Sequence, residues 1–418
     1  MKRPRGNTRK KAIICEPSNW TLLNFRLNLI QSLQARGFEV IAASPEYPKN
    51  GEFEELGVRF VRFPCSQVGL NPITGLWTIF SLWRLFRRER PDLVHQSTQK
   101  LVLYCSLAAR FAGVRAIINT VNGLGLMHGE GSIKIRIVRI LVLGSSRFAL
   151  RRPVRMCFQN SYLRDFYLKL GLVHPDQAAI IPGSGANPET FHPRERRAGT
   201  NEPLRFLMFS RMIRDKGIEE YFRAAEQMLT KRNHARPVEF VLMGGARPNN
   251  VTGVHAEWIA NPTTIPGDWL ERESARGYVQ WHPHREDVID EIHAADVVVL
   301  PSYYSEGVPR SLIEAMACGK AVITTDTPGC RDVVEKDLNG LLVPPRDVHG
   351  LAEAFAFIAD RPGLEREMGE ASRRIFMERF SDERVVKLTL EQYQLAGAPV
   401  FDDREPDRSG PEGMESVA

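Results

Sequence analysis

Short apolar runs alternate with helix-like stretches along most of this chain, and this alternation limits the possible folds more than any other feature. The first run, Lys11–Cys15, precedes a stretch in which apolar residues recur at helical spacing from Leu22 to Leu33. Gly37 ends that stretch, and the apolar run 38–44 follows. A strand–helix–strand order predicts a parallel sheet with helices on its faces.

The same alternation starts again in the second half, where strand-like runs cover 204–210, 238–245, 296–302 and 320–326. The sequence therefore predicts an α/β protein with two Rossmann-like, doubly wound domains that face each other across a cleft. The stretch Pro182–Pro203 reads as the linker between them, because it is rich in proline, glycine and charge. We expect a basic flexible arm over 1–10, domains over 11–190 and 200–375, a helix over 376–396 that returns to the first domain, and a disordered tail over 397–418.

Composition excludes several classes of protein. Of the 418 residues, 43% are hydrophobic and 25% are charged, which excludes collagen-like and globally disordered chains. No apolar run approaches the ~18 residues of a membrane-spanning helix, and no apolar segment follows the basic start as in a secretory signal. The six cysteines lie far apart and form no CxxC or Cys/His cluster, which indicates reduced thiols, a cytoplasmic protein and no zinc site.

Charge is divided unevenly along the chain. Residues 1–200 carry a net charge of +17 and residues 201–418 carry −11, although the whole chain has only +6. Such asymmetry indicates an anionic partner for the first half. Nucleic acid, acidic lipid and a phosphorylated substrate all satisfy that requirement.

The most informative motif follows the strand-like run 296–302. It reads Glu306-Gly-Val-Pro-Arg-Ser-Leu-Ile-Glu314 and places two carboxylates around a strand-to-helix turn. Pro309 suits the first helical position, so the amides of Arg310 and Ser311 would point out of a helix N-terminus, which favours phosphate. The spacing equally suits a surface ion pair between Arg310 and Glu314, and spacing alone does not separate the two interpretations.

A second motif, Ser210-Arg-Met-Ile-Arg-Asp-Lys-Gly217, begins at the end of the strand-like run 204–210. Arg211 and Lys216 could neutralise a diphosphate, the first as a bidentate donor and the second as a point charge. An exposed basic loop would have the same composition. Two such motifs at the ends of strands in one domain are more specific than either motif alone.

Together these motifs resemble those of glycosyltransferase family four, whose members are retaining enzymes with the GT-B fold. The match includes the SRMIRDKG segment, the E-x7-E element from Glu306 to Glu314, and residues 324–347. Residues 19–40, 118–125 and 158–172 resemble a bacterial surface-glycan branch. Some members of that branch add a sugar to an undecaprenyl-diphosphate-linked saccharide.

The resemblance implies a first domain that binds the acceptor and a second that binds a nucleotide diphosphate sugar, most simply a UDP-sugar. Arg211, Lys216 and Glu306 would be catalytic: the two cations would hold the diphosphate and Glu306 would contact the donor sugar. The residues implied in donor binding are Gly307, Val308, Arg310, Ser311 and Glu314, with Glu314 on the ribose hydroxyls. Asn19, Asn122 and Gly123 would line the acceptor cleft. The family's chemistry implies neither a metal nor another cofactor.

The first half departs from the wider family at two places. Pro17-Ser-Asn-Trp20 replaces the usual glycine-rich loop, and Asn122 stands where many relatives carry a histidine. Asn122 cannot act as a base. His95 follows a strand-like run and is a candidate substitute, although a polar residue at a strand end is the simpler interpretation.

Two stretches of the first half combine apolar and basic residues. In the first, Leu76 to Arg90, an apolar stripe is edged by arginines: Leu76, Ile79, Phe80, Trp83 and Phe86, with Arg84, Arg87, Arg88 and Arg90. The second, Ser132 to Arg155, contains Lys134, Arg136, Arg139, Arg147, Arg151, Arg152 and Arg155. Such faces suit an anionic membrane surface, which would bring a lipid-linked saccharide within reach at the cytoplasmic face. Core-facing helices with solvated arginines would give the same pattern.

Three other functions are alternatives to glycosyl transfer, and each would require features of its own. A GT-B sugar-nucleotide epimerase would need further acid and base residues in the cleft, which the sequence does not identify. A basic nucleic-acid-binding protein is disfavoured because the basic residues interleave with apolar helices and no recognised nucleic-acid motif is present. A Rossmann dehydrogenase would carry GxGxxG after the first strand, and this chain does not.

Overall fold

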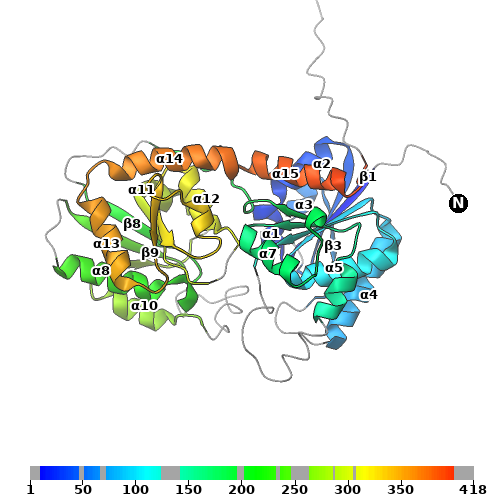
Figure 1. Ribbon diagram of the computed structural model, residues 1–418, viewed down its shortest axis with the longest axis horizontal. Coiled ribbons are helices and arrows are strands. Elements are labelled where there is room, and N and C mark those ends of the chain that lie inside the picture. Colours follow the sequence, from blue (N-terminus) through cyan, green and yellow to red (C-terminus); the bar gives the residue numbers. More distant parts are fainter. Residues whose placement is uncertain are drawn as a thin grey trace, which may run out of the picture.

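The computed structural model describes residues 10–46, 51–65, 72–123, 142–194, 202–231, 236–245, 263–285, 288–304 and 307–399. Two lobes lie side by side, each with a parallel sheet covered by helices (Figure 1). The predicted α/β architecture of two Rossmann-like domains is confirmed.

The first sheet has the strand order β3-β2-β1-β4-β5-β6-β7, and every pairing in it is parallel. Its strands are β1 (Lys10–Cys15), β2 (Phe38–Ser44), β3 (Arg59–Arg62), β4 (Leu93–Ser97), β5 (Ala116–Val121), β6 (Arg155–Phe158) and β7 (Ala178–Ile180). The central strands are buried on both faces, as expected where helices cover a parallel sheet.

Helices cover both faces of this sheet. They are α1 (Asn19–Phe25), α2 (Leu27–Ala35), α3 (Glu52–Glu55), α4 (Pro72–Glu89), α5 (Gln99–Ala112) and α7 (Ser161–Lys169). Helices α4, α5 and α7 supply the core on one face, and α1, α2 and α3 supply it on the other. The helix expected from Leu22 to Leu33 is divided into α1 and α2 at Arg26, whose side chain is drawn into a buried ion pair with Glu16.

The second sheet has the order β10-β9-β8-β11-β12-β13 and is also parallel. Its strands are β8 (Leu204–Phe209), β9 (Val238–Met243), β10 (Gln280–His282), β11 (Val297–Leu300), β12 (Ala321–Thr325) and β13 (Gly340–Val343). Its helices are α8 (Ile218–Lys231), α10 (Gly267–Ser274), α11 (Ile289–Ala294), α12 (Arg310–Ala317), α13 (Val348–Ala359) and α14 (Leu364–Arg379). This domain has a hydrophobic core of its own.

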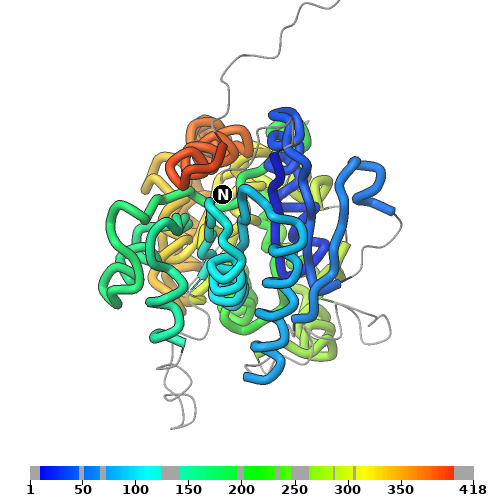
Figure 2. The backbone as a smooth tube through the Cα atoms, turned by 90° about the vertical axis from the view of Figure 1, so that its right-hand side faces the viewer, coloured from blue at the N-terminus to red at the C-terminus, as the bar shows by residue number. Residues whose placement is uncertain are grey.

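The chain returns to the first domain through helix α15 (Asp382–Leu395). Its residues Val385, Leu390 and Tyr393 are buried with those of α2, and the red helix lies over the first domain in Figures 1 and 2. Phe380 and Ser381 separate it from α14, so residues 376–396 are divided between two helices. The expected tail over 397–418 is described only to residue 399, and Ala398 in it is buried. Residues 400–418 and most of the expected arm over 1–10 lie outside the described residues.

The two segments that cross between the domains are hydrogen-bonded to each other. The Ala186 amide donates to the Phe380 carbonyl at 3.2 Å, and the Asp382 amide donates to the Ala186 carbonyl at 3.0 Å. Gly185 has φ +75°, and a Cβ there would lie 2.7 Å from the Asp382 Cα. A glycine is therefore required where the crossing segments meet.

The end of α4 is fixed to the sheet by a buried carboxylate. Glu89 pairs with Arg59, with Arg88 at 2.9 Å and with Lys11 at 3.4 Å, and its side chain is only 8% exposed. Hydrogen bonding from Arg59, supported by Arg88 and Lys11, lowers the pKa of Glu89 to about 2.

None of the described helices is long and apolar enough to cross a membrane.

We predict that Glu89→Gln lowers the free energy of unfolding by ~1–3 kcal/mol at pH 7. The folded pKa lies below the ordinary value of ~4.3, so the stabilisation is complete above that value and disappears as pH falls toward about 2. Urea unfolding of parent and variant between pH 7 and pH 3 measures the difference. Glu39→Gln is the control, because Glu39 meets two of these three cations, Lys11 at 3.4 Å and Arg59 at 3.5 Å, but is 37% exposed. Equal losses for the two variants would contradict the role given to Glu89.

Candidate functional site

The two motifs of the second domain lie together, at the carboxyl ends of the neighbouring strands β8 and β11. The Asp215 carbonyl accepts hydrogen bonds from the Tyr303 amide at 2.9 Å, the Tyr304 amide at 3.2 Å and the Ser302 hydroxyl at 3.2 Å. A Cβ on Gly217 (φ +81°) would overlap with the Pro301 carbonyl, so the first motif packs directly on the end of β11. The structure therefore joins two segments that are about ninety residues apart in the sequence.

The two cations of the first motif have different surroundings. Arg211 is exposed, and its guanidinium forms no hydrogen bond or ion pair within the described residues. Lys216 ends a 3₁₀ turn (Arg214–Lys216) and is 8% exposed. Their implied contact with a diphosphate stays a prediction, and Arg211 has the accessibility that it requires.

Helix α12 begins at Arg310, directly after Pro309. Pro309 is its N-cap, with φ −63° and ψ 123°, and the first hydrogen bond of the helix runs from the Ile313 amide to the Pro309 carbonyl at 3.2 Å. Proline was expected at the first helical position, but its extended ψ places it just outside the helix. The amides of Arg310 and Ser311 consequently belong to the first turn, where helices attract anions.

Glu314 lies one turn into α12 and is largely buried, with a side chain 13% exposed. Its Oε1 accepts a hydrogen bond from Nε of Arg310 at 2.7 Å, and Oε2 has no partner among the described residues. Burial raises the pKa of Glu314, and the charge and hydrogen bond of Arg310 oppose that rise. The ion pair between Arg310 and Glu314 therefore forms, but it is partly buried and does not lie on a solvated face. Glu306 lies outside the described residues.

The first domain contributes two side chains that the sequence analysis did not identify. Oε1 of Gln159 accepts a hydrogen bond from the Val308 amide at 3.0 Å, and Nδ2 of Asn160 donates to the Gly307 carbonyl at 3.5 Å. A Cβ on Gly307 would overlap with Oε1 of Gln159, so the turn before α12 fits tightly against the end of β6. Their position directly after a strand was the only signal in the sequence that could have indicated them.

Two of the expected acceptor-cleft residues accept hydrogen bonds within the first domain, and the contact of all three with an acceptor stays a prediction. Asn19 is buried, and its Oδ1 accepts a hydrogen bond from the Ser44 hydroxyl at 2.7 Å. Oδ1 of Asn122 accepts from the Thr98 amide at 3.3 Å and so supports a β-branched residue at φ +68°. Gly123 is partly buried at the end of its described segment. Asn122 also lies at the domain interface, because its carbonyl would be 3.0 Å from a Cβ on Gly307.

His95 is enclosed and therefore does not supply the base. It is 1% exposed, its Nδ1 lies 2.7 Å from the Tyr393 hydroxyl and its Nε2 lies 2.8 Å from the Thr120 hydroxyl. Burial, with a smaller contribution from the charge of Arg26, lowers the pKa of His95 well below its usual value. The simpler interpretation of this histidine is the correct one.

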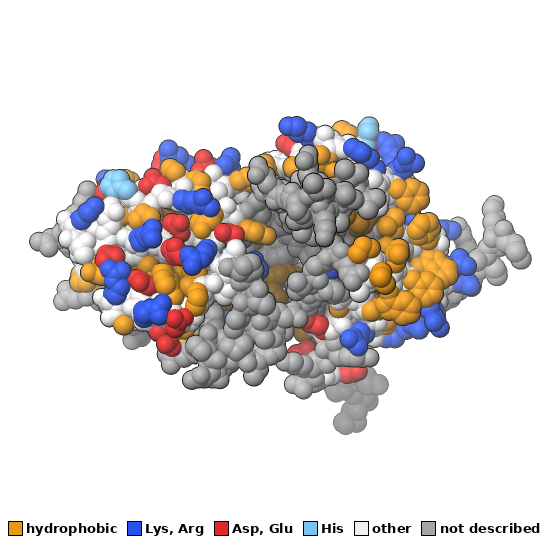
Figure 3. Space-filling view, turned by 90° about the horizontal axis from the view of Figure 1, so that it is seen from below, with side chains coloured by type: hydrophobic (Ala, Val, Ile, Leu, Met, Phe, Trp, Pro, Cys, Tyr) orange, Lys and Arg blue, Asp and Glu red, His pale blue; other side chains and the backbone are white. Residues whose placement is uncertain are grey.

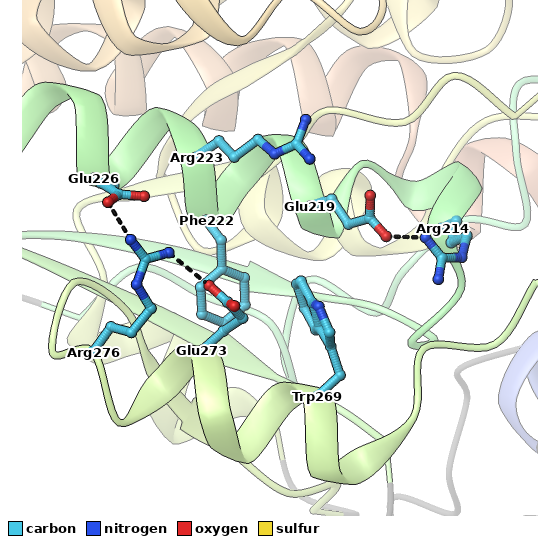
Figure 4. A pocket seen from close by; sticks show the side chains of 8 residues that line it. All are labelled: Arg214, Glu219, Phe222, Arg223, Glu226, Trp269, Glu273 and Arg276. Atoms are coloured by element: carbon cyan, nitrogen blue, oxygen red, sulfur yellow. Dashed lines mark hydrogen bonds and ion pairs between the residues drawn. The ribbon is translucent and has the colours of Figure 1, made fainter.

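A groove of about 340 Å³ lies between α8 and α10, and its lining does not include Arg211, Lys216 or Glu314 (Figure 4). Trp269 packs edge-on against Phe222 with ring centroids 5.4 Å apart. The remaining lining side chains are charged and mostly form ion pairs: Arg214, Glu219, Arg223, Glu226, Glu273 and Arg276. Since opposite charges already neutralise each other there, we assign the groove no part in the site.

Comparison with known proteins gives consistent matches over both domains. Residues 24–183 match the family described as "Glycosyl transferase 4-like domain", and residues 203–361 match "Glycosyl transferases group 1". The Campylobacter jejuni N,N'-diacetylbacillosaminyl-diphospho-undecaprenol alpha-1,3-N-acetylgalactosaminyltransferase is 25% identical over 84% of this chain and 89% of its own. The Escherichia coli UDP-Gal:alpha-D-GlcNAc-diphosphoundecaprenol alpha-1,3-galactosyltransferase is also 25% identical, over 72% of this chain and 74% of its own.

Solved structures share the arrangement of the two domains. Anabaena HepE in complex with UDP and glucose superposes with a TM-score of 0.70 at 15% identity, over 92% of this chain and 99% of that chain. At this identity the similarity concerns the fold alone.

We predict that Gly307→Ala disrupts the contact between the domains, because the added methyl group must displace Gln159 from the Val308 amide. The expected loss in the free energy of unfolding is ~1–3 kcal/mol, as for other overpacked sites. Thermal and urea unfolding provide the measurement. Gly144→Ala is the matched control, because a Cβ there meets nothing within 4 Å. A Gly307 variant as stable as this control would show that the turn before α12 tolerates a side chain.

Proposed function

The chain belongs to the GT-B glycosyltransferases, and from that premise we propose that it moves a sugar from a UDP-sugar to a lipid-linked saccharide, with retention of anomeric configuration, in the assembly of a cell-surface glycan. The observation that carries the donor part of the proposal is Glu314. Its carboxylate is largely buried in the first turns of α12, and Oε2 has no partner within the part of the chain that the structure describes. Such a group can take ribose hydroxyls beside a phosphate.

The proposed chemistry depends on charge rather than on a metal. The bond between the anomeric carbon and the diphosphate oxygen breaks, and a new bond forms between that carbon and the acceptor oxygen. The acceptor's hydroxyl proton passes to the departing diphosphate. Arg211 and Lys216 would stabilise the negative charge on that leaving group, with the first-turn amides of Arg310 and Ser311 close by. Glu306 would contact the donor sugar, as the family resemblance implies.

UDP is the proposed nucleotide because the Escherichia coli relative is named as a UDP-Gal-dependent enzyme and Anabaena HepE was crystallised with UDP. The lipid-linked acceptor is proposed because both curated relatives are named for diphosphoundecaprenol-linked saccharides. Both relatives match this chain over most of their own length. The similarity therefore includes the domain that would bind the acceptor.

We further propose that the first domain lies against an anionic membrane at the cytoplasmic face. On α4 the exposed apolar residues are Ile73 (78%), Leu76 (68%), Trp77 (59%) and Phe80 (45%). Figure 3 shows orange side chains gathered on this domain and bordered by blue ones. The exposed stripe lies nearer the start of the helix than expected. Of the residues assigned to it, Phe86 is buried, and Ile79 and Trp83 are partly buried against the core.

The described part of the stretch from Ser132 to Arg155, together with Phe111 of α5, forms a smaller surface that is also apolar and basic. Phe111 and Phe148 are 60% and 45% exposed with ring centroids 6.1 Å apart, and Arg147 and Arg151 are exposed nearby in sequence. Arg152 is exposed as well but pairs with Asp176. Arg155 does not belong to this surface, because it hydrogen-bonds Gln392 of α15. Lys134, Arg136 and Arg139 lie outside the described residues.

We predict that the parent binds UDP without added metal and that Glu314→Ala weakens this binding about 5- to 150-fold, because a ribose hydroxyl loses its buried partner. Isothermal titration with UDP, GDP, ADP and TDP provides the measurement and identifies the nucleotide. Glu378→Ala is the control, because Glu378 is an exposed glutamate of α14. An unchanged dissociation constant in the Glu314 variant would exclude the proposed ribose contact.

We also predict that replacing Arg84, Arg87 and Arg88 by Ser lowers the partition coefficient onto anionic vesicles, measured by sedimentation, about 100-fold. Each basic residue near such a surface is worth ~1 kcal/mol, so the three together are worth ~3 kcal/mol. UDP binding should not change. The same charge is removed in a control with Arg361, Arg366 and Arg374 of the second domain replaced by Ser. Equal sedimentation of the two variants would indicate that the α4 arginines are only a solvated face.

A further inference from the structure

The Arg310 side chain joins parts of the molecule that belong to different domains. From its place at the start of α12, Nε donates to Glu314 at 2.7 Å. Nη1 lies 3.2 Å from the Asn24 carbonyl and 3.4 Å from the Ser184 hydroxyl. The guanidinium carbon lies 5.3 Å from the centroid of the Phe25 ring. One side chain thus contacts the proposed ribose-binding carboxylate, the end of α1 in the first domain and the linker between the domains.

The partners in the first domain are arranged to receive a cation. Asn24 is in the last turn of α1, where carbonyl groups lack helical partners and carry partial negative charge. Phe25 offers a ring face to the guanidinium, which adds a cation–π attraction. The helix ends there because Arg26 turns inward to pair with buried Glu16 at 2.6 Å. This buried pair fixes the position of the carbonyl that Arg310 contacts.

The same region contains the crossing between the domains. Ser184 lies between Gly183 and Gly185, both with positive φ, and a Cβ on Gly183 would lie 2.6 Å from Ile313 of α12. Asp382, at the start of the returning helix, accepts a hydrogen bond from Asn28 of α2. Arg310 therefore contacts one crossing segment directly, through Ser184, and that segment is hydrogen-bonded to the other through Ala186.

We propose that Arg310 couples the occupancy of Glu314 by a nucleotide to the contact between the two domains, and so acts as a positioning residue for the acceptor domain. The proposal rests on the proposed function, because it requires a nucleotide on Glu314. Arg310 orients the carboxylate through Nε and holds α1 through Nη1. A nucleotide that fixes the carboxylate also fixes the guanidinium and, through it, the end of α1. Nucleotide binding to the second domain then restricts the motion of α1 in the first domain.

Hydrogen exchange measured by mass spectrometry tests the coupling, with UDP as the probe at a concentration that saturates each variant. In the parent, UDP should slow amide exchange over residues 19–26 at least ~5-fold, the lower end of usual coupling between sites. In Arg310→Gln the slowing should fall below ~2-fold, although peptides around the second domain's motifs remain protected. Arg310→Lys should recover only part of the effect, since an ammonium lacks the guanidinium's fork.

Phe25→Leu provides a second variant outside the donor-binding motif, and it should reduce the slowing over 19–26 while leaving the dissociation constant for UDP within ~2-fold of the parent. Equal slowing in parent and Arg310→Gln would overturn the coupling and leave the proposed function standing. So would the absence of slowing in a parent that binds UDP. Failure of the parent to bind UDP would overturn both.

Discussion

The arrangement of this molecule depends on the contact between the turn 307–310 and the first domain. Gln159 and Asn160 hold the Val308 amide and the Gly307 carbonyl, and the lack of a side chain on Gly307 allows the approach. This contact fixes the N-terminus of α12 against the carboxyl edge of the first sheet. It therefore fixes Glu314 in the place where both domains meet.

The two domains are also joined by helix α15, which packs on the first domain. Each has its own hydrophobic core, and the first domain's core is completed by α15, which comes from the far end of the chain. The Tyr393 hydroxyl of that helix lies 2.7 Å from Nδ1 of the buried His95. The two domains therefore remain one unit, while the exposed apolar surface of α4 stays available on the side of the first domain. The proposed donor site, on α12 of the second domain, and the proposed membrane-facing surface, on α4 of the first, therefore lie on different domains.

Local patterns in the sequence predicted many of the strands and helices and the two motifs, because periodicity and capping act over a few residues. The short edge strands β7, β10 and β13 were not predicted. The adjacency of the motifs followed from the parallel order of strands ending at one edge. Contacts between distant residues were not predictable: Gln159 with Val308, Arg310 with Asn24, and His95 with Tyr393. The helix break at Arg26 was missed for the same reason, since its cause is an ion pair with Glu16. The burial of Phe86 likewise depends on how α4 packs on the sheet.

The central claim is that this chain transfers a sugar from a UDP-sugar to a lipid-linked saccharide. The most direct measurement incubates the protein with UDP-sugars, one at a time and without metal, together with undecaprenyl-diphosphate-linked N-acetylglucosamine, and follows the lipid by mass spectrometry. The account predicts that one donor yields a lipid heavier by a single sugar residue, with an α-linkage and one equivalent of UDP. Release of UDP and free sugar with an unchanged lipid, or a β-linked product from an α-linked donor, would contradict it.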